Sequence, residues 1–168
     1  DRHIAHALDE LSLAIPFESI ATLATSSGSA DLDVSAVDGL ISVDRIEYPV
    51  GEFPPCYVPF GRWANTVTML LDCLPTGEDA RLSYTARQTL DAGGTTLAGF
   101  LEDLVVMGAA AYAVLEQATA TVDVLTTGVA VPERFEAAAR ARLTAFHQLL
   151  LQHGRNNRFR TRQLRRPA

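Results

Sequence analysis

The sequence predicts an α+β protein with a helical core, an inserted antiparallel β region and an extended C-terminal tail. The first observation behind this prediction is the helical spacing of apolar residues near residues 1–15, 96–118 and 132–153. The second is a run of short β-prone segments, divided by Gly, Pro, Ser and Asp, over residues 17–90. The third is the segment 154–168, which is rich in arginine and has too few apolar residues to pack a core.

The length and composition suit one compact domain. A chain of 168 residues buries roughly 70% of the surface that its unfolded form exposes. We expect a single domain over residues 1–153 and a basic tail over residues 154–168. No apolar stretch approaches the roughly 20 residues of a membrane-spanning helix. Because Asp1 lies inside a helical pattern and no Met or signal peptide precedes it, we expect the natural chain to extend upstream.

Charge is distributed unevenly along the chain. Residues 1–153 contain all 20 acidic residues and eight of the 14 arginines, a net charge of −12. Residues 154–168 contain six arginines and no acidic residue, a net charge of +6. An acidic body of this kind repels DNA, whereas a basic tail is suited to a nucleic acid or an acidic protein surface.

The helical core is expected to contain an N-terminal helix and a C-terminal antiparallel helix pair. A proline ends the N-terminal pattern, because it removes a backbone donor. Thr95 and Thr96 are expected to cap the second helix, in which the small residues Gly108–Ala111 let another helix approach closely. Pro132 is a favoured first residue for the third helix. A connection rich in Thr and Val, residues 119–131, is expected to join the pair.

The β region is expected to contain two hairpins. The first joins strands near residues 18–25 and 30–35 through a Ser-Ser-Gly-Ser turn. The second joins residues 67–71 and 82–86 through a Pro-Thr-Gly-Glu-Asp turn. Both expectations rest on turn residues that separate two segments of alternating polarity.

The segment between these hairpins carries two further signals. The apolar alternation changes phase within Leu40–Tyr48, which predicts a β-bulge near Asp44 and Arg45. Residues 49–62 contain four prolines and are expected to form an extended connection, because proline cannot donate to a central sheet ladder. This loop is a candidate contact surface. Its candidate aromatic contacts are Phe53, Tyr57 and Trp63.

No catalytic or metal site can be assembled from the sequence. Cys56 and Cys73 lack the paired spacing of zinc and redox motifs, so we interpret them as reduced structural thiols. The histidines lack the i, i+4 spacing with a carboxylate that metal-dependent hydrolases use. The acidic residues near 31–33 and at 102–103 fit a solvated strand face and an early helix turn. We therefore expect a protein without catalytic activity, metal or cofactor.

The basic tail is the most pronounced functional feature. It could be a solvated tail, a nucleic-acid arm or a peptide that docks on a protein and is free until it binds. Apolar anchors among the guanidinium groups favour docking on a grooved acidic surface. The candidate docking residues are Arg155, Arg158, Phe159, Arg160, Arg162, Leu164, Arg165 and Arg166.

The order of these features resembles the head-to-tail adaptor proteins, also called connector or neck proteins, of tailed bacteriophages. The resemblance covers most of the chain and is one of texture, without a signature motif. The segments that carry it are the opening Asp1–Ser12, Val43–Pro49 followed by Phe53–Pro55, Leu82–Tyr84, and Glu102–Ala113.

This resemblance implies a structural virion protein at the head–tail interface, assembled in the host cytoplasm. Such a protein forms a ring of about twelve copies, as closed cyclic symmetry allows. The ring joins the capsid portal to the tail, extends the DNA channel without sequence-specific DNA binding, and docks to the portal through its C-terminal segment. Its expected partners are the portal, its own copies and tail-side proteins, without a membrane. The alternative is a nucleic-acid-binding module that uses the arginine-rich arm.

The chain departs from this family in one respect. The β region, residues 17–90, is large beside the compact helical adaptors.

Overall fold

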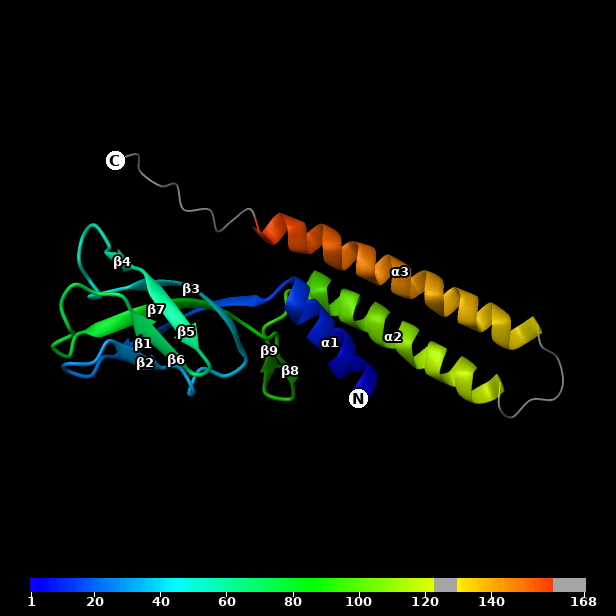
Figure 1. Cartoon of the computed structure of the whole chain (residues 1–168). Coiled ribbons are helices and arrows are strands. Elements are labelled where there is room, and N and C mark those ends of the chain that lie inside the picture. Colours follow the sequence, from blue (N-terminus) through cyan, green and yellow to red (C-terminus); the bar gives the residue numbers. More distant parts are fainter. Residues whose placement is uncertain (123–129, 159–168) are drawn as a thin grey trace. The chain divides into compact units, whose positions relative to one another are not determined.

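A computed structural model describes the backbone of residues 1–122 and 130–158 and the side chains of residues 1–120 and 134–155. The described residues form α-helices and antiparallel sheets, as Figure 1 shows. This confirms the predicted α+β class.

Tertiary contacts divide the chain into two compact units. The helical unit comprises Asp1–Ile15 and the chain from Gln88 onward, and the β unit comprises Pro16–Arg87. Where the sequence predicts one domain with a β insertion, the contacts therefore gather the inserted residues into a unit of their own.

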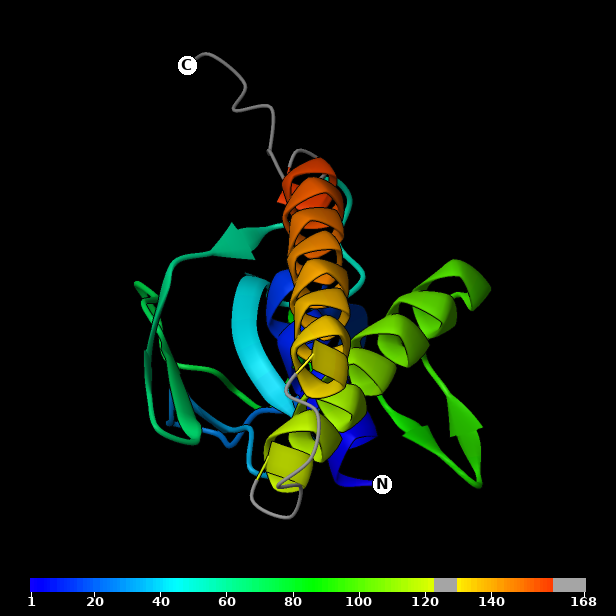
Figure 2. The same ribbon diagram turned by 90° about the vertical axis from the view of Figure 1, so that its right-hand side faces the viewer.

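The helical unit is built from both ends of the chain. Its elements in the described residues are α1 (Arg2–Ala14), the small hairpin β8 (Leu90–Asp91) and β9 (Gly94–Thr95), α2 (Gly99–Val122) and α3 (Ala130–Arg158). Figures 1 and 2 show α3 lying alongside α2 and crossing it at an angle. Gly108 faces Phe146, and Phe100 lies near His153, so the two helices run antiparallel as predicted.

Phe146 is the centre of the helical core. Its side chain is fully buried among apolar residues of all these helices, including Leu11 and Val105. A Cβ added to Gly108 would lie 2.9 Å from the Phe146 ring, so only glycine leaves room for it. The prediction that the small residues at 108–111 admit a close helix is therefore confirmed.

A buried polar network fixes the point where the chain returns to the helical unit. The Gln88 backbone N–H donates to Ser12 Oγ at 3.0 Å, and the Gln88 side-chain amide donates to the Ile15 carbonyl, also at 3.0 Å. Ser12 Oγ in turn donates to the Leu8 carbonyl at 2.7 Å. These bonds satisfy polar groups that would be costly to bury unpaired. They fasten the segment after the β unit to the last turn of α1.

Several predicted helix boundaries are wrong. Thr95 and Thr96 do not cap α2, because their side chains hydrogen-bond within the β8–β9 hairpin region, and the helix begins at Gly99. Helix α2 continues to Val122, so the predicted connection 119–131 begins too early. Helix α3 begins before Pro132, at Ala130, and continues past residue 153 to Arg158. Residues 123–129 lie outside the described part of the chain.

The β unit contains two antiparallel sheets. The first has the order β1 (Phe17–Ala24), β7 (Asp79–Ala86), β3 (Leu40–Glu47), β4 (Tyr57–Val58). The second has the order β2 (Asp31–Asp33), β6 (Thr66–Met69), β5 (Phe60–Trp63). Buried residues of both sheets, among them Ile46, Leu82, Val67 and Met69, form one apolar core.

Both predicted hairpins are wrong. Strand β1 pairs with β7, and β2 pairs with β6, although β1 and β2 are neighbours in sequence. The predicted second hairpin likewise divides, because β6 pairs with β2 and β5 while β7 pairs with β1 and β3. The turns therefore pass the chain from one sheet to the other. Their sequences do not reveal this, because partner choice depends on which faces are buried together.

The two expectations for residues 40–62 have different outcomes. The bulge is confirmed, because the β3–β7 register shifts between Val43 and Arg45, with a second shift between Leu40 and Ser42. The connection contains no central strand, as predicted, but it is not free of strands, because β4 lies within it and β5 begins within it. Each is an edge strand of its sheet. An edge strand tolerates a nearby proline such as Pro59, because only one of its sides needs backbone hydrogen bonds from the sheet.

Candidate functional site

The three aromatic residues predicted to form a contact surface do not form one cluster. Phe53 is 97% exposed in the loop before β4, and Trp63 is 87% exposed at the end of β5. Tyr57 belongs to the four-stranded sheet, whereas Trp63 belongs to the three-stranded sheet. The arrangement offers two separate apolar contact points, one at each end of the β4–β5 segment.

Tyr57 belongs to a polar face of the four-stranded sheet. The Arg45 guanidinium lies 5.4 Å from the centre of the Tyr57 ring, within the range of a cation–π contact. Arg45 Nε also donates to Ser83 Oγ on the neighbouring strand β7 at 3.3 Å. These contacts hold the Arg45 side chain along the sheet.

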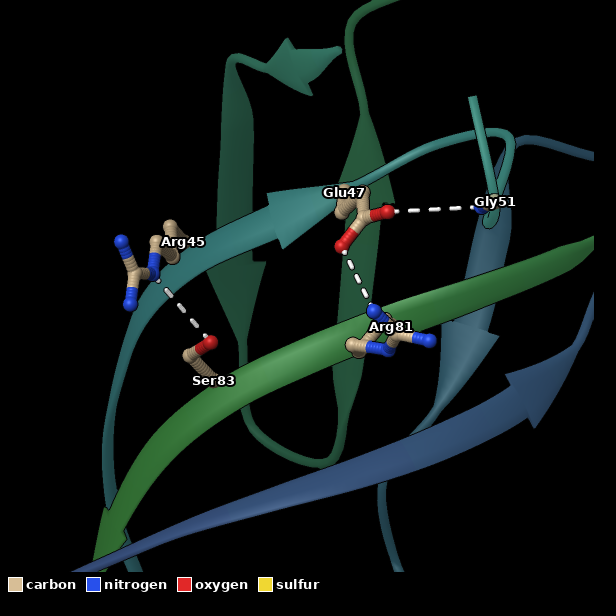
Figure 3. Close-up of polar contacts among 5 residues, drawn as sticks. All are labelled: Arg45, Glu47, Gly51, Arg81 and Ser83. Atoms are coloured by element: carbon tan, nitrogen blue, oxygen red, sulfur yellow. Dashed lines mark hydrogen bonds and ion pairs between the residues drawn. The ribbon is translucent and has the colours of Figure 1, made fainter. Parts of the chain in front are cut away.

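Glu47 anchors the loop that follows β3, as Figure 3 shows. Its carboxylate is buried and accepts a charged hydrogen bond from Arg81 Nη1 at 3.1 Å. It also accepts a bond from the Gly51 backbone N–H at 3.4 Å. Gly51 has φ +94°, a conformation that favours glycine. The Glu47 carboxylate, paired with Arg81 on β7, thus ties Gly51 at the start of the loop that carries Phe53 to the sheet.

Sequence reasoning did not single out Glu47 or Arg45 for this role. The alternation of β7 places Arg81 on the face opposite the buried Ala80 and Leu82, but its partner depends on the β3–β7 register. The bulge near Asp44 sets that register. In the sequence, this register was therefore indicated only by the change of phase in the apolar alternation within β3.

A second carboxylate fastens the turn before β7. Glu78 accepts bonds from Thr76 Oγ1 at 2.6 Å, from the Thr76 N–H at 3.0 Å and from the Tyr48 hydroxyl at 2.6 Å. These bonds, first that from the Thr76 hydroxyl and then that from the Tyr48 hydroxyl, lower the pKa of Glu78 from its ordinary 4.5 to about 2. Burial and the Glu78 carboxylate raise the pKa of Tyr48. A carboxylate with so low a pKa is a weak general base near neutral pH.

The lowered pKa of Glu78 predicts that the stability of the protein depends on pH. Glu78→Gln should remove the contribution of this carboxylate to that dependence. Because the folded-state pKa lies below the ordinary value, Glu78 contributes stability above about pH 4.5 that is lost as the pH falls to about 2. We expect the melting temperature of Glu78→Gln to fall less over this range than that of the wild type. Glu52→Gln, at an exposed loop position, is the control. Parallel melting profiles for wild type and Glu78→Gln would contradict the prediction.

In the helical unit, one carboxylate joins three helices. Glu10 of α1 accepts a bond from the Tyr112 hydroxyl of α2 at 2.8 Å. His147 Nε2 of α3 lies 3.4 Å from the same carboxylate, and His6 Nε2 lies 4.0 Å away. Burial and the Glu10 charge raise the pKa of Tyr112 to about 12, so its hydroxyl stays protonated as a donor. This cluster locks the helices together.

A further ion pair holds the start of α1. Glu116 of α2 lies 2.5 Å from Arg2 Nη2 and 2.8 Å from His3 Nε2. The hydrogen bond from Arg2 is the main cause of the lowered pKa of Glu116. These side chains, like those around Glu10, connect secondary-structure elements to one another.

The predicted docking tail lies mainly outside the described residues. Arg155 is exposed on α3, and Arg158 is the last residue of that helix. Gly154 is buried, and a Cβ added to it would lie 2.8 Å from the Ala14 carbonyl. Gly154 therefore belongs to the helical unit and not to the tail. The candidates outside the described residues are Phe159, Arg160, Arg162, Leu164, Arg165 and Arg166.

The described residues contain neither a metal-binding cluster nor a membrane-spanning helix. They contain no group of three or more His, Cys, Asp or Glu side chains arranged to hold a metal ion. Cys56 and Cys73 are free, as expected of reduced thiols, but both are exposed, so the interpretation that they are structural is wrong. None of the helices, as far as they are described, is long and apolar enough to cross a membrane.

The sequence matches no family model and no curated protein with significant similarity.

Proposed function

We propose that this protein is a structural subunit of the neck of a tailed bacteriophage. It forms a ring that joins the capsid portal to the tail and extends the channel through which DNA passes. The observation that carries the proposal is a set of large apolar side chains that the helices of the helical unit leave exposed. Each of five large apolar side chains there is more than half exposed: Leu13, Phe100, Val106, Phe135 and Leu151.

Exposed apolar side chains of this kind are suited to contacts between subunits. Single exposed apolar residues are ordinary, but here α1, α2 and α3 all carry them. In a closed ring, each subunit buries two different surfaces against its neighbours. A protein whose helices are apolar on more than one side fits that demand better than a monomer does.

The charge distribution fits a DNA channel. The net charge of −12 over residues 1–153 disfavours binding to the phosphate backbone, so DNA can pass without being held. The six arginines of residues 154–168 have the opposite sign and suit an acidic surface of the portal.

The β unit supplies contact points for other neck or tail proteins. Phe53 and Trp63 are almost fully exposed, and aromatic residues are enriched in the buried centres of protein interfaces. Glu47 and Arg81 position the loop that carries Phe53. In this proposal the grouped carboxylates serve structure, since each ties one backbone segment to another, and the protein is not an enzyme.

A truncation after Arg158 tests the portal contact. It leaves α3 whole, whereas truncation after His153 would remove Gly154 from its contact with α1. We expect electron micrographs to show rings stacked on portal assemblies with the intact chain and not with the truncated one. Stacking that survives the truncation would remove the docking role from the tail. A wild type that neither forms rings nor associates with portals would overturn the proposed function.

A matched variant separates a docking peptide from a nucleic-acid arm. Phe159→Ser with Leu164→Ser keeps every arginine of the tail and removes its apolar anchors. A docking peptide loses portal binding with this variant, because the anchors fill pockets in the partner. A phosphate arm keeps DNA binding, and that binding weakens steeply with salt. Salt-dependent DNA binding without portal binding would favour the nucleic-acid-binding module.

A further inference from the structure

Helix α2 has an exposed face that is almost free of charge. Its residues recur every three or four positions, and all of them are exposed: Asp103, Val106, Ala110, Ala113, Gln117 and Ala120. The exposed face of an amphipathic helix ordinarily carries charged and polar residues. Beyond Asp103, this outer face of α2 carries small or apolar side chains and a single amide.

Helix α3 has a similar face on the side away from its buried stripe. The outer face of α3 consists of Arg134, Ala138, Ala141, Ala145, Gln148, Gln152 and Arg155, all exposed. The spacing again alternates between three and four residues, which is the spacing of two helices that pack along their length. Alanine at the contact permits helix axes to approach to about 8 Å.

One copy of the chain cannot bring these two faces together. Gly108 and Phe146 mark the sides on which α2 and α3 pack against each other. At 3.6 residues per turn, Ala110 and Ala113 lie nearly half a turn around α2 from Gly108. Ala141 likewise lies nearly half a turn around α3 from Phe146. The two outer faces therefore point away from the helix pair, where a second copy can reach them.

The charges beside the two faces are opposite in sign. Every charged residue of α2 is acidic, and Glu102 and Asp103 have no ion-pair partner among the described residues. On α3, Arg134, Arg142 and Arg155 are exposed and likewise have no ion-pair partner in that part of the chain. Two α2 faces would repel each other, and so would two α3 faces. An α2 face against an α3 face brings opposite charges together.

We propose that the outer face of α2 in one copy binds the outer face of α3 in the next copy. This inference rests on the proposed function, because it names the surface through which ring subunits associate. The contact is heterologous, so each copy keeps a free α2 face at one side and a free α3 face at the other. A contact of this kind repeats until the ring closes.

Paired cysteines test this contact in the full chain. Cys56→Ser with Cys73→Ser removes the two native thiols, both of which are exposed. Ala110→Cys and Ala141→Cys are then introduced together or singly, and the assembled protein is treated with a short bismaleimide, alone and with portal assemblies. The control combines Ala110→Cys with Ala36→Cys, an exposed position in the β unit.

The heterologous contact predicts that the bismaleimide gives a ladder of cross-linked trimers and larger species only when Ala110→Cys and Ala141→Cys are combined. Neither single variant links, because like faces do not meet. Linked dimers from Ala110→Cys alone, or an equal ladder from the control pair, would overturn the inference. Rings in electron micrographs without any ladder would also overturn it and leave the proposed function standing. A chain that neither assembles nor links would overturn both.

Discussion

Phe146→Ala is expected to destabilise the helical unit by about 3–5 kcal/mol. The Phe146 ring is fully buried between α1, α2 and α3, so its removal leaves a cavity that the surrounding helices fill only in part. Urea unfolding followed by far-ultraviolet circular dichroism measures the loss, because the helices dominate that signal.

Phe135→Ala is the matched control for this prediction. Phe135 lies on the same helix but is 58% exposed, so we expect a loss of less than about 1 kcal/mol in the unassembled chain. Equal losses for the two phenylalanines would mean that α3 does not pack through Phe146.

A double variant tests the contact between Gly108 of α2 and the Phe146 ring of α3. Gly108→Ala alone inserts a Cβ into the space of the ring and is expected to cost about 1–3 kcal/mol. In the Phe146→Ala background the same change meets a cavity and should cost less. Additive losses would contradict the close approach of α2 and α3, since residues in contact couple.

Ile46→Ala is expected to destabilise the β unit by about 2–5 kcal/mol. Ile46 is fully buried in the core that both sheets share, opposite Leu82 of β7 in the β3–β7 register. Hydrogen exchange of backbone amides in β3 and β7 measures the effect within the β unit. Protection of these amides should fall in proportion to the lost stability.

Ile20→Ala provides the control on a neighbouring strand. Ile20 points to the opposite face of the same sheet and is 62% exposed. We expect its replacement to change stability by less than about 1 kcal/mol. If Ile20 proved as costly as Ile46, the assignment of the buried face of the sheet would be wrong.

The approximate positions of α1, α2 and α3 could be predicted from the sequence. Helix α1 ends where Pro16 predicts, and Gly108 lies where the small residues predict a close helix. The helix ends were harder, because residues 95 and 96 resemble a helix cap but hydrogen-bond within a local hairpin region. Capping signals and turn signals use the same residue types, so only tertiary contacts distinguish them.

The candidate site could be predicted in part. Exposure of Phe53 and Trp63 follows from a proline-rich segment that cannot form a central strand, and the structure places both at the surface. The roles of Glu47 and Glu10 could not be predicted. Each carboxylate meets partners far away in the sequence, such as Arg81 and Tyr112, and no local pattern encodes such distances.

The sequence by itself determined the α+β class, the positions of the helices, the alternating faces of the strands and the separation of an acidic body from a basic tail. These features depend on local periodicity and composition, which each segment carries within itself. Only the tertiary structure decided which strands pair and which carboxylates join distant elements. The physical reason is that strand partners are selected by burying two sheets against one core, a free energy that belongs to the whole unit and to no single turn.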